Sequence, residues 1–234
     1  MQALILAGGL GTRLRRVVND CPKPMALVNG KPFLQYLIEK LVQQDIRHIV
    51  LCTGYLGEQI EEYFQDGSRF NCRISYSRER VSLGTSGALK LAEPFIEEDS
   101  FLLLNGDTFL ELGYFHMYRE HPKRKVDLTI APVKKTEASR YGSIRIDRQN
   151  RVVEFKEKDG GDLTDYINGG VYILEKHLLN RITAGKKLSL ELDIIPSMLE
   201  EQILIFGYKV RGHFIDIGLP ETYIQFQRDM LGRC

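Results

Sequence analysis

The chain has 234 residues, of which 43% are hydrophobic and 27% charged, a balance typical of a globular protein and too apolar for disorder. The 32 Lys and Arg residues nearly balance the 31 Asp and Glu residues, so the net charge of +1 gives no global field that favours nucleic acid or an anionic membrane. No apolar run approaches the roughly 18 residues of a membrane-spanning helix, and the chain opens without the basic region of a secretory signal. We therefore expect a soluble, cytoplasmic protein with no nucleic-acid or membrane partner.

The four cysteines are scattered over the sequence, at Cys21, Cys52, Cys72 and Cys234. They form no C-x-x-C pair and accompany no cluster of histidines, so neither a disulfide scaffold nor a zinc site is expected. Reduced thiols in a cytoplasmic protein are the interpretation that this pattern favours.

The first half of the chain alternates strand and helix patterns. The predicted strands cover Gln2–Ala7, Arg47–Thr53, Arg73–Ser77 and Phe101–Leu104. Apolar residues at helical spacing predict a helix from Pro32 onward and further helices over Gly57–Phe64 and Thr85–Ala92. This alternation is typical of a parallel sheet with helices on both faces.

The second half is richer in strands. They are predicted over Val126–Val133, Ser143–Asp147, Arg151–Lys156, Ile167–Leu174 and His213–Ile217, with helices over Leu192–Glu201 and Pro220–Leu231. The turn at Arg148-Gln149-Asn150 predicts an antiparallel hairpin. No linker or repeat separates the halves. We predict one α/β domain over residues 1–234 with a Rossmann-like, mainly parallel mixed sheet flanked by helices and a small antiparallel part, its halves meeting at about residue 125.

A glycine-rich loop, Leu6-Ala7-Gly8-Gly9-Leu10-Gly11-Thr12-Arg13-Leu14, follows the first strand. Glycine permits positive φ and lets backbone N–H groups approach phosphate oxygens, while Thr12 and Arg13 add a hydroxyl and a cation. The loop is no P-loop, because no Gly-Lys-Ser/Thr follows, and Leu14 stands where the dinucleotide fingerprint needs a small residue. Alone, it is more typical of a tight strand-to-helix turn.

Lys23 lies between two prolines, Pro22 and Pro24, some ten residues beyond this loop. The prolines restrict the backbone and so reduce the entropy lost when the ammonium binds an anion. A solvated lysine in a rigid loop is the alternative for this segment alone. The loop and the lysine together are far more specific than either.

Together these segments resemble the sugar-phosphate nucleotidyltransferases, also called nucleoside-diphosphate-sugar pyrophosphorylases. The resemblance covers nearly the whole chain and continues in order through Asn105-Gly106-Asp107-Thr108, Glu157-Lys158, Asn168-Gly169-Gly170 and Phe214-Ile215-Asp216-Ile217-Gly218. In its short length and overall sequence character, the chain is most similar to the bacterial D-glycero-α-D-manno-heptose 1-phosphate guanylyltransferases. The resemblance implies an enzyme that joins an NTP, expected to be GTP, to a sugar 1-phosphate, expected to be this heptose phosphate, and releases pyrophosphate.

The resemblance also assigns site residues. It implies catalytic roles for Arg13, Lys23 and Asp107, and nucleotide binding by Leu6, Ala7, Gly8, Gly9, Gly11, Thr12, Arg13, Lys23, Gly84 and Thr85. The antiparallel part in the second half is expected to bind the sugar phosphate through Gly142, Glu157, Lys158, Asn168 and Gly169. Near the nucleobase segment, Val81 and Ser82 stand where relatives often carry an acidic residue and proline.

Asp107 and Asp216 are the predicted Mg²⁺ ligands. Each follows an apolar strand pattern, and Mg²⁺ takes one or two carboxylates together with phosphate oxygens and water. Alone, either aspartate is more typical of a turn or a helix cap. The resemblance implies the metal role for both.

Other functions stay open at this point. A nucleotide-binding regulator without catalysis is one, and an NAD-dependent oxidoreductase is a weaker one that Leu14 opposes. Within the enzyme class, mannose, glucose or muramic-type sugar phosphates and UTP or dTTP are the alternative substrates. The chain is expected to act as a monomer or a homodimer.

Overall fold

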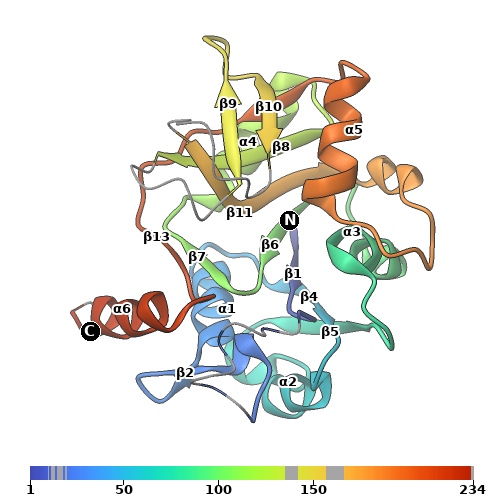
Figure 1. Cartoon of the computed structure of the whole chain (residues 1–234). Helices are drawn as coiled ribbons and strands as arrows, with labels where there is room; N and C mark the ends of the chain where they lie inside the picture. The colour runs from blue at the N-terminus through green and yellow to red at the C-terminus, as the bar shows by residue number, and fades with distance from the viewer. Residues whose placement is uncertain are drawn as a thin grey trace.

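A computed structural model describes residues 1–9, 11, 14, 18, 20–134, 142–156 and 166–232 (Figure 1). The sheet of this described part contains nine strands, which are β1 (Gln2–Leu6), β4 (His48–Thr53), β5 (Arg73–Arg78), β6 (Ser100–Asn105), β8 (Leu128–Lys134), β9 (Ser143–Ile146), β10 (Val152–Lys156), β11 (Tyr166–Glu175) and β12 (Ile205–Gly207). Two short ribbons accompany it, β2 (Leu27–Val28) with β3 (Lys31–Pro32), and β7 (Thr108–Leu110) with β13 (Phe214–Asp216).

The parallel part of the sheet is built around β1. This strand lies between β4 and β6, both parallel to it, and β5 extends the parallel part beyond β4. On the other side, β11 runs antiparallel to β6, and β9 and β10 form an antiparallel pair. The predicted mixed, mainly parallel sheet with a small antiparallel part is therefore confirmed.

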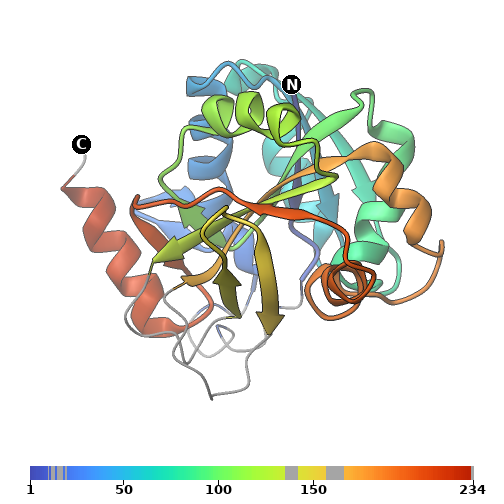
Figure 2. The ribbon, with the colours of Figure 1, turned by 90° about the horizontal axis from the view of Figure 1, so that it is seen from above.

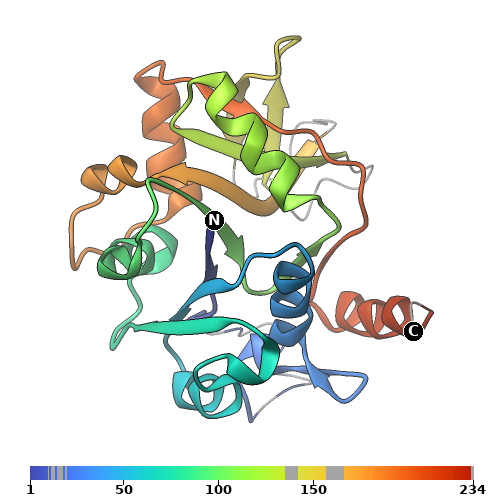
Figure 3. The ribbon, with the colours of Figure 1, turned by 180° about the vertical axis from the view of Figure 1, so that it is seen from behind.

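Helices cover both faces of the sheet because alternate residues of β1 point to opposite sides. Ala3 and Ile5 belong to the core that packs against α1 (Phe33–Gln43), α2 (Gly57–Phe64), α4 (Tyr114–Arg124) and α6 (Pro220–Leu231). Leu4 belongs to the opposite core, which includes α3 (Gly84–Leu91) and α5 (Ile195–Glu200). Seen from above, α6 lies at the edge opposite α3 and α5 (Figure 2). Seen from behind, α1 and α4 lie on the same face of the sheet (Figure 3).

Most predicted elements coincide with observed ones, and α2 and α6 have the predicted bounds. The predicted helix over Leu192–Glu201 differs, because this segment begins as a π-helical turn, η7 (Leu190–Ile194), before α5. Ser189 caps that turn, its hydroxyl accepting the N–H groups of Glu191 and Leu192. Helix α4 and strand β7 were not predicted as elements. The remaining turns are η2 (Lys23–Met25), η3 (Ser68–Phe70), η4 (Glu93–Phe95) and η6 (Lys176–Arg181).

None of the helices in the described ranges has the length and apolar character that crossing a membrane requires.

Candidate active site

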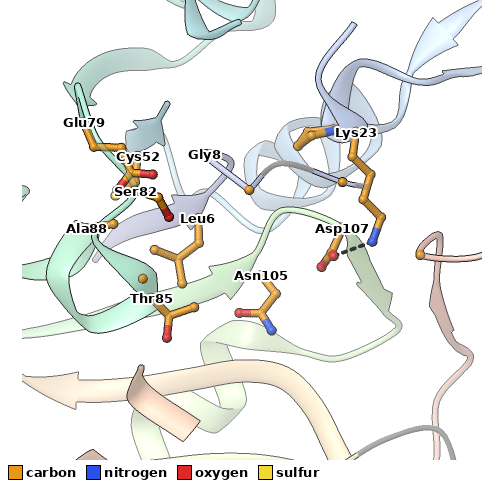
Figure 4. A pocket seen from close by; sticks show the side chains of 15 residues that line it. Leu6, Gly8, Lys23, Cys52, Glu79, Ser82, Thr85, Ala88, Asn105 and Asp107 are labelled. Atoms are coloured by element: carbon orange, nitrogen blue, oxygen red, sulfur yellow. Dashed lines mark hydrogen bonds and ion pairs between the residues drawn. The ribbon is translucent and has the colours of Figure 1, made fainter. Parts of the chain in front are cut away.

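A cavity of about 330 Å³ lies at the carboxyl ends of the parallel strands β1, β4 and β6 (Figure 4). Ligands of open α/β sheets bind at this edge, so the position itself favours a binding site. The predicted residues that line it are Leu6, Gly8, Gly9, Gly11, Lys23, Gly84, Thr85 and Asp107. Its other lining residues are Pro24, Cys52, Glu79, Ser82, Ala88, Asn105 and Gly218. Ala7 is not among them, while Thr12 and Arg13 lie outside the described residues.

Two glycines of the loop after β1 are required by what surrounds them. Gly11 has a φ of +57°, and a Cβ there would lie 2.8 Å from Cβ of Lys23. A Cβ on Gly8 would lie 3.0 Å from Oε1 of Glu79, whereas no atom of the described residues lies within 4 Å of a Cβ built on Gly9. The loop therefore passes between Lys23 and Glu79, with no room for side chains at the two contact points.

Lys23 lies between the two predicted metal ligands. Its Nζ is 2.5 Å from Oδ2 of Asp107 and 3.3 Å from Oδ1 of Asp216. The turn η2 begins at Lys23, with Pro22 before it and Pro24 in its first positions, so both predicted prolines restrict the backbone that carries the ammonium. The Lys23 side chain is only 8% exposed, whereas those of Asp107 and Asp216 are 39% and 23% exposed.

The three charges stabilise one another against the cost of burial. Burial alone would lower the pKa of Lys23, but Asp107 and Asp216 hold that pKa above its usual value. Burial would likewise raise the pKa of Asp107, but the Lys23 ammonium holds it below its usual value. The cluster therefore contains an ammonium and an ionised Asp107 at neutral pH. We call Lys23, Asp107 and Asp216 the charged cluster.

The ribbon formed by β7 and β13 brings the two aspartates together from distant parts of the chain. Asp216, the last residue of β13, pairs with Thr108, which follows Asp107 directly. The backbone N–H of Ile217 donates to the carbonyl of Asp107 over 3.0 Å. Sequence patterns predicted neither β7 nor its pairing, so the sequence did not indicate how the fold brings these two aspartates together.

Gly218 completes the charged cluster and leaves it no spare room. Its N–H donates to Oδ1 of Asp216. A Cβ on Gly218 would lie 2.7 Å from that oxygen and 3.1 Å from Nζ of Lys23. Any larger residue would therefore displace either the carboxylate or the ammonium.

The placement of Asp107 and Asp216 fits a magnesium ion. Both carboxylates already converge on one cationic atom, and two carboxylates exceed what a single ammonium neutralises. Within the described ranges, no group of three or more His, Cys, Asp or Glu side chains gathers in a metal-binding arrangement. A pair of carboxylates suits Mg²⁺, which draws its other ligands from phosphate and water, better than it suits metals that need a full protein cage.

Glu79 lines the far end of the cavity and was not predicted. It follows β5 directly, and its Oε2 accepts the backbone N–H of Leu83 over 2.9 Å. Its Oε1 faces Gly8 and Gly54. Burial raises the pKa of this carboxyl, against the Leu83 hydrogen bond that lowers it. A carboxylate at the carboxyl end of a parallel strand is the signal that would have found it.

The comparisons with known proteins agree on the family. The model of the nucleotidyl transferase family matches residues 2–233. The chain belongs to the nucleotidyl transferase family. It is 42% identical to a D-glycero-α-D-manno-heptose 1-phosphate guanylyltransferase of Aneurinibacillus thermoaerophilus, with 98% of each chain covered. It is 38% identical to the protein of that name from Campylobacter jejuni, covering 97% of this chain and 98% of the relative.

A solved structure extends the agreement to three dimensions. The nucleotidyl transferase superposes on the crystal structure of HddC from Yersinia pseudotuberculosis complexed with GMP-PN with a TM-score of 0.86. The two are 37% identical, and the match covers 98% of this chain and 99% of that one. The fold and the family of the chain, and hence its character as a sugar-phosphate nucleotidyltransferase, therefore rest on full-length similarity in both sequence and structure.

The predicted sugar-phosphate residues of this nucleotidyl transferase are partly brought together. The backbone N–H of Asn168, on β11, donates to the carbonyl of Gly142 over 3.0 Å. Gly169 is required by packing, because a Cβ there would lie 2.4 Å from the carbonyl oxygen of Ala131. Glu157 and Lys158 lie outside the described residues.

A second polar cluster joins the cavity wall to β11. Oε2 of Glu191 accepts the hydroxyls of Thr85 and Ser189 over 2.7 and 2.9 Å, and Oε1 accepts the hydroxyl of Tyr172 over 3.1 Å. We call Glu191, Thr85, Ser189 and Tyr172 the hydroxyl cluster. The sequence predicted only Thr85 as functional, because no local pattern marks a glutamate on a π-helical turn.

Proposed function

We propose that this chain transfers the guanylyl group of GTP to D-glycero-α-D-manno-heptose 1-phosphate, giving the GDP-sugar and pyrophosphate. The observation that carries the proposal is the charged cluster at the carboxyl edge of the sheet, in a chain that is 42% identical over its full length to an enzyme of that name. The proposal places this activity in the cytoplasm, in a single domain whose halves, about 1–125 and 126–234, serve nucleotide and sugar phosphate. It assigns no nucleic-acid or membrane partner and a monomer or homodimer as the working form.

The proposed reaction needs charge neutralisation rather than a strong base. A phosphate oxygen of the sugar phosphate attacks the α-phosphorus of GTP, the bond to the β-phosphate oxygen breaks, and pyrophosphate leaves on the opposite side. The attacking phosphate is already an anion at neutral pH, so no proton has to be removed. The Lys23 ammonium would move away from Asp107 and Asp216 and neutralise charge near the α-phosphate. Catalysis is then mostly positioning and electrostatics.

Asp107 and Asp216 would hold the magnesium ion that the proposal requires. When bound, Mg²⁺ neutralises phosphate charge and polarises the phosphoryl oxygens. The other assignments follow the family resemblance. Arg13, Thr12 and the glycine-loop amides would bind the departing pyrophosphate, while Lys158 would hold the attacking phosphate and Glu157, Asn168, Gly142 and Gly169 would line the sugar site.

Glu79 supports guanine as the base. Guanine presents two adjacent donors, N1–H and the N2 amino group, and a carboxylate offers two acceptor oxygens and no donor. The Oε1 oxygen of Glu79 faces the cavity wall at Gly8, next to the loop that would hold the phosphates. Adenine presents an acceptor at N1, which a carboxylate would repel. Relatives often carry an acidic residue at the position of Val81. In this chain Glu79, two residues earlier, is the acidic residue that lines the cavity.

Pyrophosphate release tests the proposed activity directly. The purified enzyme with Mg²⁺ is assayed with GTP, ATP, CTP, UTP and dTTP against heptose, mannose and glucose 1-phosphates. We expect the largest kcat/KM for GTP with the manno-heptose phosphate. A larger value for another pair would overturn the substrates and keep the reaction. Nucleotide binding without pyrophosphate from any pair would favour a regulator.

Glu79→Gln tests the base assignment within the same assay. The amide puts a donor in place of one acceptor, so the preference for GTP over ATP should fall by about tenfold to a hundredfold. The matched control is Glu201→Gln, which makes the same chemical change at an exposed residue paired with Arg181. An unchanged GTP-to-ATP ratio in Glu79→Gln would remove Glu79 from base recognition.

A further inference from the structure

Glu191 is a buried carboxylate whose partners are hydroxyl groups. The residue is 9% exposed, and within the described part of the chain no Lys, Arg or His forms an ion pair with it. Tyr172 is fully buried beneath it. A buried charge of this kind is costly unless several donors satisfy it, and here three hydroxyls do so.

The direction of every hydrogen bond in this cluster is fixed by backbone and amide donors. Thr85 Oγ1 accepts the N–H of Leu190 over 2.7 Å, and Ser189 Oγ accepts the N–H of Glu191 over 3.2 Å. Tyr172 Oη accepts Nδ2 of Asn168 over 2.6 Å. Each hydroxyl thus accepts from a nitrogen and donates its own hydrogen to Glu191. The acceptor-only, ionised form of Glu191 matches this pattern.

The same directionality reaches the amide of Asn168. The backbone N–H of Gly170 donates to Oδ1 of Asn168 over 3.1 Å, which fixes the amide with Nδ2 toward Tyr172. Tyr172 therefore accepts from Asn168 and donates to Glu191. One Nδ2 hydrogen bonds to Tyr172, and the second is left to donate elsewhere. The amide thus presents a donor in one defined orientation.

The cluster also connects the cavity wall at Thr85 to strand β11. Thr85 lies in the first turn of α3 and lines the cavity at its nucleotide side. Asn168 and Tyr172 lie on β11, where the register shifts between them. Gly170, between those two residues, is packed so that a Cβ would lie 3.1 Å from Nδ2 of the lining residue Asn105. Glu191 is the one residue of the described chain that bonds to both Thr85 and Tyr172.

We propose that Glu191 is a positioning residue for both substrates. Its ionised carboxylate fixes the Thr85 hydroxyl at the nucleotide side and, through Tyr172, fixes the Asn168 amide as a donor toward the sugar phosphate. This assignment of sides rests on the proposed function. Glutamine at position 191 would place an NH₂ group against at least one hydroxyl that already donates, so the pattern would have to rearrange.

Steady-state kinetics of two variants separates the two arms. Glu191→Gln should raise the KM for both GTP and the sugar phosphate, by about fivefold to tenfold each. Tyr172→Phe removes the hydroxyl that bonds to Glu191 and Asn168 but keeps the bond between Thr85 and Glu191, so it should raise the KM for the sugar phosphate by a similar factor and leave that for GTP unchanged. Glu201→Gln, an exposed control, should change neither. An unchanged sugar-phosphate KM in Tyr172→Phe would overturn the proposal.

A substrate-free readout follows the amide itself. The side-chain NH₂ signal of Asn168, assigned by its loss in Asn168→Ser, is recorded in ¹H–¹⁵N spectra. We expect it to shift in Tyr172→Phe and in Glu191→Gln but not in Glu201→Gln. A signal unmoved in Glu191→Gln would overturn the relay even if kinetics changed. Because this readout needs no turnover, a wild-type enzyme inactive on every substrate pair would overturn the proposed function alone.

Discussion

The charged cluster and the hydroxyl cluster border the same cavity but are built in opposite ways. In the charged cluster, two partly exposed carboxylates share one buried ammonium, and its members come from positions 84 and 193 residues away from Lys23. In the hydroxyl cluster, one buried carboxylate receives three neutral donors. The charged cluster can exchange its ammonium for another cation and keep both carboxylates. The hydroxyl cluster loses a hydrogen bond when any one of its hydroxyls is replaced.

The charged cluster is therefore suited to take part in the reaction, and the hydroxyl cluster is suited to hold other side chains in place. Ions that must meet a phosphate and a metal need partners they can release, and an ammonium between two carboxylates has them. Fixed amides and hydroxyls need a partner that never changes, and an ionised carboxylate enclosed by donors provides it. Changes in the charged cluster should therefore affect turnover, whereas changes in the hydroxyl cluster should affect binding.

Asp107→Asn should have the largest effect. The amide cannot hold a metal ion as a carboxylate does and cannot neutralise Lys23, so kcat should fall on the order of a hundredfold or more. Lys23 keeps Asp216 as a partner, so the thermal unfolding midpoint should change little. Pyrophosphate release and thermal unfolding measure the two quantities.

Asp216→Asn provides the matched comparison at the other carboxylate. It should likewise lower kcat far more than stability, with Lys23 retaining its 2.5 Å contact to Asp107. Magnesium-dependent turnover near the wild-type level in both variants would contradict the assignment of these residues as metal ligands.

Lys23→Ala should have the next largest effect. It removes the ammonium assigned to the α-phosphate and leaves two carboxylates facing each other, so pyrophosphate formation should slow by about a hundredfold. The rate is measured in a single turnover with enzyme in excess. A change confined to the KM for the sugar phosphate would take Lys23 out of this role.

Gly218→Ala tests how little room the charged cluster has. The added methyl would lie 2.7 Å from Asp216 Oδ1, so the carboxylate must move, and we expect kcat to fall by about tenfold. The φ of Gly218 is not positive, so the backbone accepts alanine without strain. Gly232→Ala, at a glycine outside the site whose added Cβ has no described atom within 4 Å, is the control that should retain full turnover. Equal activity in the two variants would show that the tight contact at Gly218 is not needed.

The fold could largely be predicted from the sequence because its strands carry their own signal. Buried parallel strands such as β1 and β6 are short apolar runs, and α1 places apolar residues at helical spacing. Helix α4 was not predicted as an element although Tyr114 and Met117 are buried, because Pro122 and charged residues fill its second half. Strand β7 was missed because three residues following an aspartate turn carry no period of their own.

The site residues likewise fall into those that a local sequence pattern predicted and those that it did not. The glycine loop and Lys23 are sequence-local, and of their described residues Leu6, Gly8, Gly9, Gly11 and Lys23 line the cavity. Glu79 was missed although it directly follows β5, which was predicted as a strand, whereas Glu191 was missed because its role depends on partners that the fold brings near. Glu191 meets Thr85 across 106 residues of sequence, and no pattern in either segment refers to the other.

A third polar cluster, centred on His121, gives the smallest expected effect. It tests whether burial alone explains the difference between the charged cluster and the hydroxyl cluster. His121 is 1% exposed, with Nδ1 2.7 Å from the hydroxyl of Thr129 and Nε2 3.0 Å from Oε1 of Glu175. Burial lowers its pKa, against Glu175, which raises it. Because an unfolded histidine titrates near 6.5, the unfolded chain takes up the proton first as pH falls below about 6.5, and stability decreases there.

The slope of unfolding free energy against pH therefore identifies His121. Wild-type stability should be constant near pH 7.5 and should decrease as pH falls through 6.5, whereas His121→Gln should show a shallower decrease. Burial also lowers the pKa of His48, so some slope should remain in the variant. Denaturant unfolding at half-unit pH steps measures both proteins, and equal slopes would contradict the assignment.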